Sequence, residues 1–319
     1  MLRRSLPHLL VLLLALTINF FLPRAMPGSP LPYIVGEEAG RLSPEERQRV
    51  LAQYGLERPL WEQFGLYLRR LLQGDLGRSL QNKQPVLQLI LERLPWTLLL
   101  SGSALLLASG LGLLLGAFAA RYRGGWLDRT GFAGAVLLDA MPSFWLGMLL
   151  IALFAVQWPI LPVYGAYTAW ANLQGLAWLL DVGRHLILPA LTLTLSSLAG
   201  MFLVTRYAML DTLHQDYIRT AWAKGLPERQ VIFKHALRNA ALPVVTLFML
   251  NLGSLVGGAV VVETVFSYPG LGRLLYEAAS ARDYPVLQGL LLFFTLSVVA
   301  FNLLAELLYP WLDPRTRYA

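Results

Sequence analysis

Six long apolar stretches, separated by polar segments, dominate the hydrophobic pattern of the chain. A helix needs about 20 mostly apolar residues to cross the hydrocarbon layer of a bilayer, and each stretch comes near that length. The pattern therefore predicts an all-α integral membrane protein with six transmembrane helices. The predicted spans are Leu6–Leu22, Leu94–Ala120, Gly131–Val156, His185–Tyr207, Ala241–Val262 and Val286–Tyr309.

Composition agrees with this pattern and excludes several kinds of site. Of the 319 residues 56% are hydrophobic and 14% are charged, whereas soluble domains carry about a quarter charged residues. The absence of cysteine excludes disulfides, iron–sulfur clusters and thiolate metal sites. The four histidines show no metal-binding spacing, and no nucleotide-binding P-loop motif occurs. We therefore expect no catalytic, cofactor-binding or metal-binding residues in this chain.

The net charge of +7 is concentrated in particular segments. Basic residues gather at the N-terminus, in the loop Arg121–Arg129, in the stretch Asp216–Pro243 and at the C-terminal tail. The short loops Gln157–Arg184 and Glu263–Pro285 carry only one and two basic residues. Because cytoplasmic loops of membrane proteins are enriched in Lys and Arg, both termini are predicted to be cytoplasmic. The charge indicates orientation, and we expect no nucleic-acid partner.

The segments outside the spans carry their own helix signals. Ser43, Pro44 and Glu46 have the spacing of a capping box that begins a helix. A second helix is predicted over Pro59–Gln73, ending at Gly74. Both lie in an extracytoplasmic helical segment between the first two spans, which either caps the bundle or docks an external partner.

The predicted spans and loops divide the chain into four parts. Residues 1–25 are predicted to be an N-terminal anchor helix, since no small-residue cleavage site follows the first span; a cleaved signal peptide is the alternative. Residues 26–93 are the extracytoplasmic helical segment. Residues 94–310 are a five-helix core containing a cytoplasmic loop, 211–240. Residues 311–319 are a cytoplasmic tail.

Few ionisable residues lie within the predicted spans; the main ones are Asp139 and Glu306. A charge inside a bilayer is costly, so Asp139 is expected to face the protein interior or water, either joining helices or lining a path. Gly112 and Gly116 have the spacing of closely packed membrane helices, and Pro142 predicts a kink. The candidate pathway or gate residues are Asp139, Asn251, Ser254, Tyr268 and Asn302.

The stretch Asp216–Pro243 combines basic residues with Gly and Pro. Asp216 is predicted to cap a short helix, Tyr217–Lys224, which has Tyr217, Ile218, Ala221 and Trp222 on one apolar face. Gly225 takes the position that needs positive φ, and Pro227 starts a second helix from Glu228. A bent helix pair with an exposed apolar-aromatic face and a basic rim fits a groove on another protein. An amphipathic helix on anionic lipid is the alternative.

The segment YIRTAWAKGLPERQVIFKHALRNAALPVV resembles the cytoplasmic coupling loop of ABC importer permeases, above all their dipeptide and oligopeptide branch. The motif of this loop in the family begins with Glu-Ala-Ala, which three further residues separate from a glycine. When Gly225 is aligned with that glycine, residues 219–221 take the Glu-Ala-Ala positions. Trp222 is a departure, because the branch usually has Arg there. The segments MPGSP, YGLERPLWEQF, GDLGRSL, MPSFWLGMLL and ETVFSYPGLGRLLYEAASARDYPVLQG are similar to the same branch in the same order.

The resemblance implies a type I ABC importer permease fold in the bacterial inner membrane, with a peptide as substrate. It implies a second homologous permease subunit, two cytoplasmic ABC ATPase subunits that bind ATP and Mg, and an extracytoplasmic solute-binding protein. This chain would form half of the path and would not itself be an enzyme. Dipeptides, oligopeptides, nickel chelates and oligosaccharides remain open as substrates.

By the same resemblance, part of the cytoplasmic loop couples the permease to the ATPases. A secondary transporter or channel that works without ATPases is the alternative, disfavoured by the scarcity of charges within the spans. The residues implied for ATPase coupling are Asp216, Tyr217, Arg219, Thr220, Ala221, Trp222, Lys224, Gly225 and Leu226.

Overall fold

Long apolar helices make up most of the computed structural model, as the hydrophobic pattern predicts. The structure describes residues 2–26, 28–254 and 259–312. The side chains of residues 2–12, 37–38, 254, 305–306 and 308–312 lie outside the described residues. Two compact units are present, and each is described by itself. The first comprises Met1–Pro95 and Gly270–Val299, and the second comprises Trp96–Pro269 and Ala300–Ala319.

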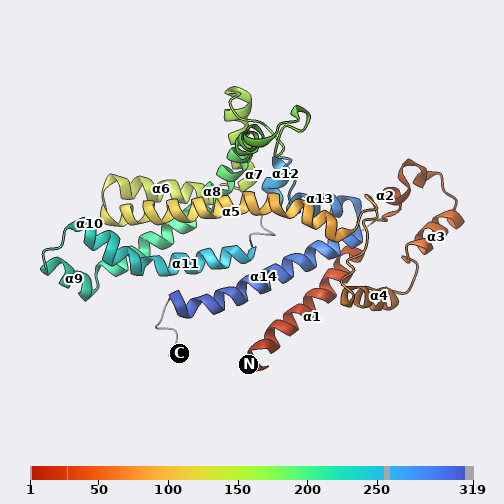
Figure 1. The fold of residues 1–319 in the computed structure, drawn as a ribbon, viewed down its shortest axis with the longest axis horizontal. Helices are drawn as coiled ribbons and strands as arrows, with labels where there is room; N and C mark the ends of the chain where they lie inside the picture. Colours follow the sequence, from red (N-terminus) through yellow and green to blue (C-terminus); the bar gives the residue numbers. More distant parts are fainter. Residues whose placement is uncertain (1, 27, 255–258, 313–319) are drawn as a thin grey trace. The chain divides into compact units, whose positions relative to one another are not determined.

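The first unit contains short helices between the longer ones (Figure 1). Both helices predicted within residues 26–93 are confirmed, because Ser43 caps α3 and Gly74 takes a φ of +76° directly after the turn that ends α4. The elements are α1 (Leu2–Ala25), α2 (Leu31–Val35), a 3-10 turn (Gly36–Gly40), α3 (Pro44–Gln53), α4 (Leu60–Leu72), the start of α5 (Val86–Arg121), α13 (Leu271–Ala281) and most of α14 (Tyr284–Leu312).

A buried carboxylate organises the turn that precedes α5. Asp283 is only 2% exposed and accepts hydrogen bonds from Ser79 Oγ at 2.6 Å and from the backbone N–H of Leu80 at 3.1 Å and Gln81 at 3.2 Å. A carboxylate that accepts several hydrogen bonds is compensated for its burial. These bonds join the segment before α5 to the α13–α14 junction, more than 200 residues later in the chain.

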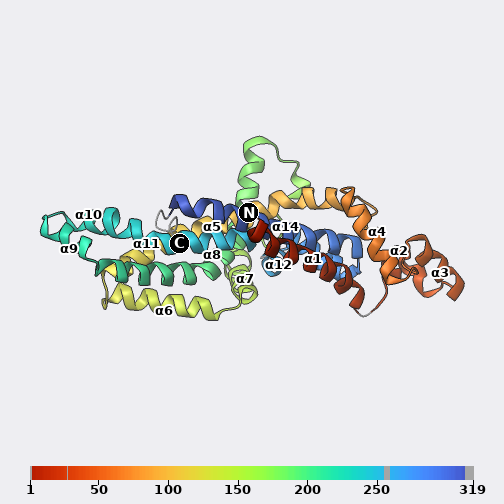
Figure 2. The same ribbon diagram turned by 90° about the horizontal axis from the view of Figure 1, so that it is seen from below.

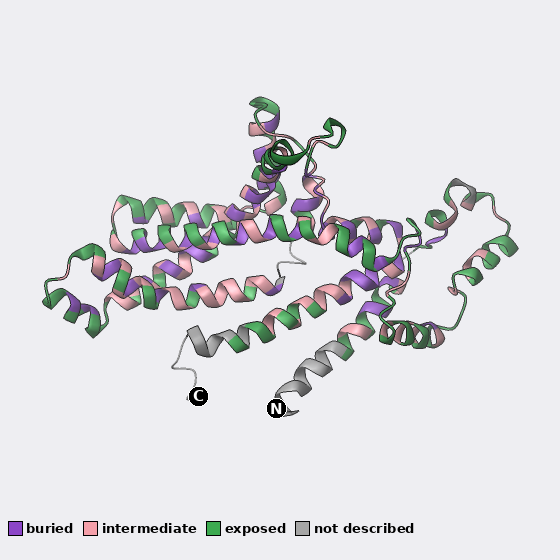
Figure 3. Ribbon diagram, in the orientation of Figure 1, coloured by how far each residue is buried: buried purple, intermediate pink, exposed green. Residues whose placement is uncertain are grey.

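The second unit is arranged around α8, which contacts α6, α7, α11 and α12 (Figure 2). Buried positions recur along α8 where these helices meet it (Figure 3). The elements are the rest of α5, α6 (Trp126–Ala140), α7 (Ser143–Ile151), a π-helical turn (Ala152–Gln157), a 3-10 turn (Ala169–Ala171), α8 (Gly175–Leu213), α9 (Asp216–Ala223), α10 (Glu228–Gln230), a π-helical segment (Val231–Ala236), α11 (Leu237–Ser254) and α12 (Val260–Val265).

Two glycines allow α5 to approach α8 closely. A Cβ added at Gly116 would lie 2.6 Å from Thr205 Cβ, and one at Gly112 would collide with Met201. The predicted small-residue packing of Gly112 and Gly116 is therefore confirmed, because only a hydrogen atom fits at either contact. Gly253 and Gly257, in the fifth predicted span, have the same spacing and are predicted to pack in the same way, but Gly257 lies outside the described residues.

The structure supports part of the predicted set of membrane spans. Among the described residues, four helices are long and apolar enough to cross a membrane: Val86–Arg121, Gly175–Leu213, Glu228–Gly253 and Tyr284–Leu304. The predicted kink at Pro142 is confirmed, since α6 and the helix from Ser143 to Gln157 meet at 102°, the geometry of a broken span or a re-entrant loop. The first predicted span, Leu6–Leu22, remains a prediction, as do the extracytoplasmic insertion and the four-part division of the chain.

Candidate functional site: the elbow from α9 to the π-helical segment

The candidate site is the elbow, which we define as residues 215–236: α9, the turn through Gly225, α10 and the π-helical segment. The prediction that Asp216 caps α9 was wrong, because Gln215 is the N-cap and makes no side-chain capping bond. The backbone of Gln215 is extended, with ψ of 149°, so Asp216 already belongs to the first helical turn. A carboxylate there still interacts favourably with the helix dipole.

The turn after α9 follows the sequence prediction. Gly225 has φ of +73°, and the backbone N–H of Leu226 bonds to the carbonyl of Ala221 at 3.4 Å. A Cβ at Gly225 would have no heavy atom within 4 Å, so the left-handed backbone conformation, and not lack of space, favours glycine. Pro227 then caps α10, which begins at Glu228 as predicted.

The residues that the sequence predicts to form one apolar face of α9 are partly buried and partly exposed. Ile218 is fully buried and Ala221 is 5% exposed, whereas Tyr217 and Trp222 are 40% and 46% exposed. The prediction of one exposed face is therefore corrected, because α9 contacts the π-helical segment and turns Ile218 and Ala221 towards it. The apolar cluster around them contains Ala117, Ala120, Met209, Val231, Ile232, Ala236 and Ala240.

Polar contacts join the elbow to neighbouring helices. Arg121, at the end of α5, forms a two-pronged ion pair with Glu228 at 2.9 and 3.0 Å. Asn239 of α11 donates a hydrogen bond to the hydroxyl of Tyr217 at 2.7 Å. Together with the buried cluster, these bonds connect the elbow to α5, α8 and α11.

A second ion pair lies beside the elbow and was missed by the sequence analysis. Arg206 of α8 donates to Asp128 of α6 at 2.6 and 3.0 Å, and Asp128 is only 4% exposed. The same carboxylate accepts the backbone N–H of Gly124 at 2.9 Å. An acidic residue within the basic loop Arg121–Arg129 was the available signal, but its partner is 78 residues away.

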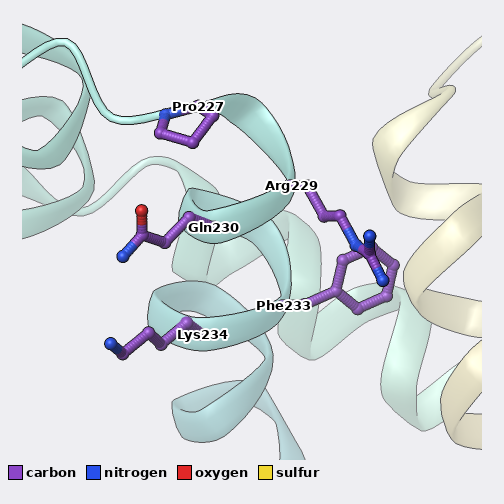
Figure 4. Close-up of a pocket in the computed structure, with 5 residues that line it drawn as sticks. All are labelled: Pro227, Arg229, Gln230, Phe233 and Lys234. Atoms are coloured by element: carbon purple, nitrogen blue, oxygen red, sulfur yellow. The ribbon is translucent and has the colours of Figure 1, made fainter.

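The exposed side of the elbow carries cations and aromatic rings. Arg219 and Asp216 are 3.5 Å apart and both exposed, so their attraction contributes little. An open hollow of about 490 Å³ is lined by Pro227, Arg229, Gln230, Phe233 and Lys234, with Arg229 and Phe233 extending to one side of the helix (Figure 4). This surface can bind acidic or aromatic groups of a partner protein.

The candidate pathway residues lie on different elements of the structure. Asp139 is exposed near the end of α6, so the interior of this chain is excluded as its environment. Tyr268 is fully buried, with its ring 6.1 Å from that of Trp96. Asn251 and Asn302 are partly exposed on α11 and α14, and the side chain of Ser254 lies outside the described residues.

The chain has a further buried carboxylate that the sequence analysis did not single out. Glu263 of α12 is fully buried and accepts a hydrogen bond from Thr97 of α5 at 2.7 Å. Within the described part of the chain, no three His, Asp or Glu side chains are grouped so that they could hold a metal ion.

Comparison with protein families covers almost the whole chain. Residues 112–318 match the family described as binding-protein-dependent transport system inner membrane component. Residues 1–101 match the family described as the N-terminal part of the membrane component of such systems. The longer match includes the elbow, α8 and both ion pairs described above.

Individual relatives are similar over nearly their full length. The dipeptide transport system permease protein DppB of Escherichia coli is 39% identical, over 94% of this chain and 93% of the relative. The glutathione transport system permease protein GsiC of Pectobacterium atrosepticum is 41% identical, over 99% of this chain and 98% of the relative. The oligopeptide transport system permease protein AppB of Bacillus subtilis is 39% identical, over 99% of this chain and 98% of the relative. The chain therefore belongs to the family of binding-protein-dependent transport system inner membrane components, the multi-pass permease subunits of ABC importers.

Proposed function

We propose that the chain is a permease subunit of an ATP-driven peptide importer and that its elbow receives the movement of an ATPase. The names of the relatives support a peptide substrate, because they include dipeptide, oligopeptide and glutathione permeases. The chain would form half of the translocation path in a bacterial inner membrane. Its six spans would take the type I importer fold, with both termini cytoplasmic and residues 26–93 outside.

The observation that carries the proposal is that one side of α9 is buried within this chain and the other side is exposed. Ile218 and Ala221 are packed inside the chain, while Trp222 is 46% exposed. A protein that grips the exposed side would therefore pull on a helix already packed against the ends of α5, α8 and α11. Interiors are closely packed and transmit strain, so movement of the elbow would move these helices as a rigid body.

Burial also assigns different roles to the proposed coupling residues. Asp216, Tyr217, Arg219, Thr220, Trp222 and Lys224 are exposed and would contact the ATPase. Ala221, Gly225 and Leu226 would instead give the elbow its shape, through the buried face of α9 and the bond between Leu226 and Ala221. Bulk at Ala221 would then disturb packing within this chain before it disturbed docking.

The proposed partners are those of the family. They are a second homologous permease, two cytoplasmic ABC ATPases that bind ATP and Mg, and an extracytoplasmic solute-binding protein. We propose that this chain binds no cofactor and performs no catalysis. The family description, which names binding-protein-dependent transport, supports the external partner.

A cross-linking experiment tests the elbow directly, since the chain has no natural cysteine. Trp222→Cys and Ala221→Cys are compared in the complete reconstituted transporter, using a short thiol-to-amine cross-linker. Trp222→Cys is expected to capture an ATPase subunit. Ala221→Cys, one residue away but 5% exposed, is expected to give less than about a tenth of that product.

Two outcomes would contradict the proposal. One is the absence of ATPase cross-links from Trp222→Cys and Arg229→Cys in a complex that still transports. The other is transport of Ala-Ala into liposomes by the purified chain alone, which would favour the secondary transporter instead.

A further inference from the structure

A cavity of about 620 Å³ lies within the first unit, far along the chain from the elbow. It is lined by the end of α1, by α4 with the segments on either side of it, and by the first turns of α14. This volume is typical of small-molecule sites and is much larger than a single carboxylate needs. Tyr54, Tyr67 and Tyr284 are part of its lining.

The lining is strongly cationic. Asp75 is the one acidic residue that lines the cavity among the described residues, and its carboxylate accepts the backbone N–H of Gly77 at 2.8 Å. Among the side chains that the structure describes, none of the lining cations forms an ion pair. The lining cations are Arg24, Arg58, Arg70, Arg78 and Lys83, so the formal net charge of the lining is +4.

Arg24 is partly buried and has donors to spare. Its Nη1 donates to the carbonyl of Phe20 at 3.0 Å, and its Nε donates to Gln63 Oε1 at 3.0 Å. These are two of the five N–H donors of a guanidinium group. The guanidinium also lies 3.7 Å from the ring centre of Phe20, which orients it without neutralising it.

Two further donors lining the cavity have no partner among the described residues. Gln288 is only 6% exposed, and its Nε2 makes no hydrogen bond. The buried hydroxyl of Tyr67 is also unpartnered, and burial raises the pKa of Tyr67, so it remains a neutral donor. Buried donors are almost always satisfied in folded proteins, so these two leave hydrogen-bonding capacity unused beside the cavity.

The cavity's chemistry and position favour phosphate over other anions. Guanidinium groups bind phosphate through paired hydrogen bonds, and the lining offers four of them. Arg24 follows the end of the first predicted span, Leu22, by two residues, and Tyr284 begins α14. Arg and Tyr at span ends are typical of the headgroup level of a bilayer. We propose that this cavity binds a phosphate oxyanion, carried by a phospholipid headgroup or by the free ion.

The test uses the purified full chain in maltoside detergent, which contains no phosphate. Bound phosphatidylglycerol is counted by native mass spectrometry, diacylglycerol serves as the phosphate-free lipid, and inorganic phosphate is followed by equilibrium dialysis. We expect about one phosphatidylglycerol per chain and at least about tenfold weaker binding in Arg24→Gln and Arg70→Gln. Arg70 is exposed and forms no ion pair among the described side chains, so its variant is expected to keep the fold even if Arg24→Gln does not.

Arg69→Gln is the matched control, since Arg69 is exposed beside Arg70 on α4 but does not line the cavity. It should bind like the wild type. Saturable binding of the lipid assigns the headgroup as the source, and binding of inorganic phosphate alone assigns the free ion. The proposal is overturned if diacylglycerol binds as tightly as phosphatidylglycerol, if Arg69→Gln and Arg70→Gln weaken binding equally, or if neither phosphate source binds.

Discussion

The short helices α3 and α9 are held in opposite ways. α3 has ten residues, none of them buried, and a complete capping box in which Ser43 and Glu46 exchange hydrogen bonds. α9 has eight residues and no side-chain cap, but Ile218 and Ala221 are buried. Figure 3 shows α3 as mostly exposed positions, whereas buried positions interrupt α9. A short helix can thus be stabilised from its end or from its face.

The difference decides which helix can transmit movement. Helices shorter than about 12–15 residues are marginal in water by themselves, so each needs support. A cap contributes about 1 kcal/mol and acts only on the first turn. Burial of a side chain such as Ile218 contributes about 1.5–3 kcal/mol and joins α9 to other helices. α9 is therefore joined to the rest of its unit by a buried face, which α3 lacks.

The largest effect is expected for Ile218→Ala. Removing a fully buried Ile side chain costs about 2–5 kcal/mol, because it loses apolar burial and leaves a cavity. Hydrogen exchange of the amides of α9 in the purified full chain, without the ATPase, should become faster by a factor of at least about 10. Arg219→Ala, next to it and exposed, should leave exchange close to the wild-type rate. Equal effects of the two variants would show that α9 is not held by its buried face.

A smaller effect is expected for Gly225→Ala. A left-handed conformation costs a residue with a Cβ about 1–2 kcal/mol, and here the cost is purely conformational because the space is open. Exchange of the turn amides from Lys224 to Leu226 should become faster. The control is Gly65→Ala in the middle of α4, which also has open space and should slow exchange, since Ala favours helix. The same sign for both variants would contradict this account.

The smallest effect is a pH dependence of α3. Hydrogen bonds from the backbone and side chain of Ser43 lower the pKa of Glu46. A lowered pKa means that the stabilisation is present above the ordinary pKa of about 4.3 and is lost as pH falls below it, through the folded value. The protection of the amides in the first turn of α3 against hydrogen exchange, corrected for intrinsic rates, should therefore decrease as the pH is lowered below about 4.3. Glu46→Gln keeps the capping bond and should remove the pH dependence.

Elements with strong local signals were predicted well from the sequence. The capping box at Ser43, the turns at Gly74 and Gly225, the break at Pro142 and the close approach of Gly112 and Gly116 are all confirmed. Each depends on backbone conformation or on the size of one residue. The wrong prediction that Asp216 caps α9 also rested on a local signal. It missed the true N-cap, Gln215, by one residue, because neighbouring positions at a helix end have similar signals.

The candidate site was predicted only in outline. The sequence located the elbow and its basic residues, yet it placed Ile218 and Ala221 on the outside with Trp222. An amphipathic pattern identifies an apolar face without saying what covers it. The ion pairs Arg121–Glu228 and Arg206–Asp128 could not be assigned from the sequence either, since their partners are 107 and 78 residues apart.

The sequence by itself determined that this protein is a helical membrane protein, where its apolar stretches lie and where the chain turns. These features depend on solvent transfer and on backbone preferences within a few residues. Only the tertiary structure decided which side of α9 is buried, which charges are paired, and that Arg24, Arg70 and Gln288 line one cavity. The reason is that burial and electrostatic pairing depend on segments that are distant in the chain and come together only on folding.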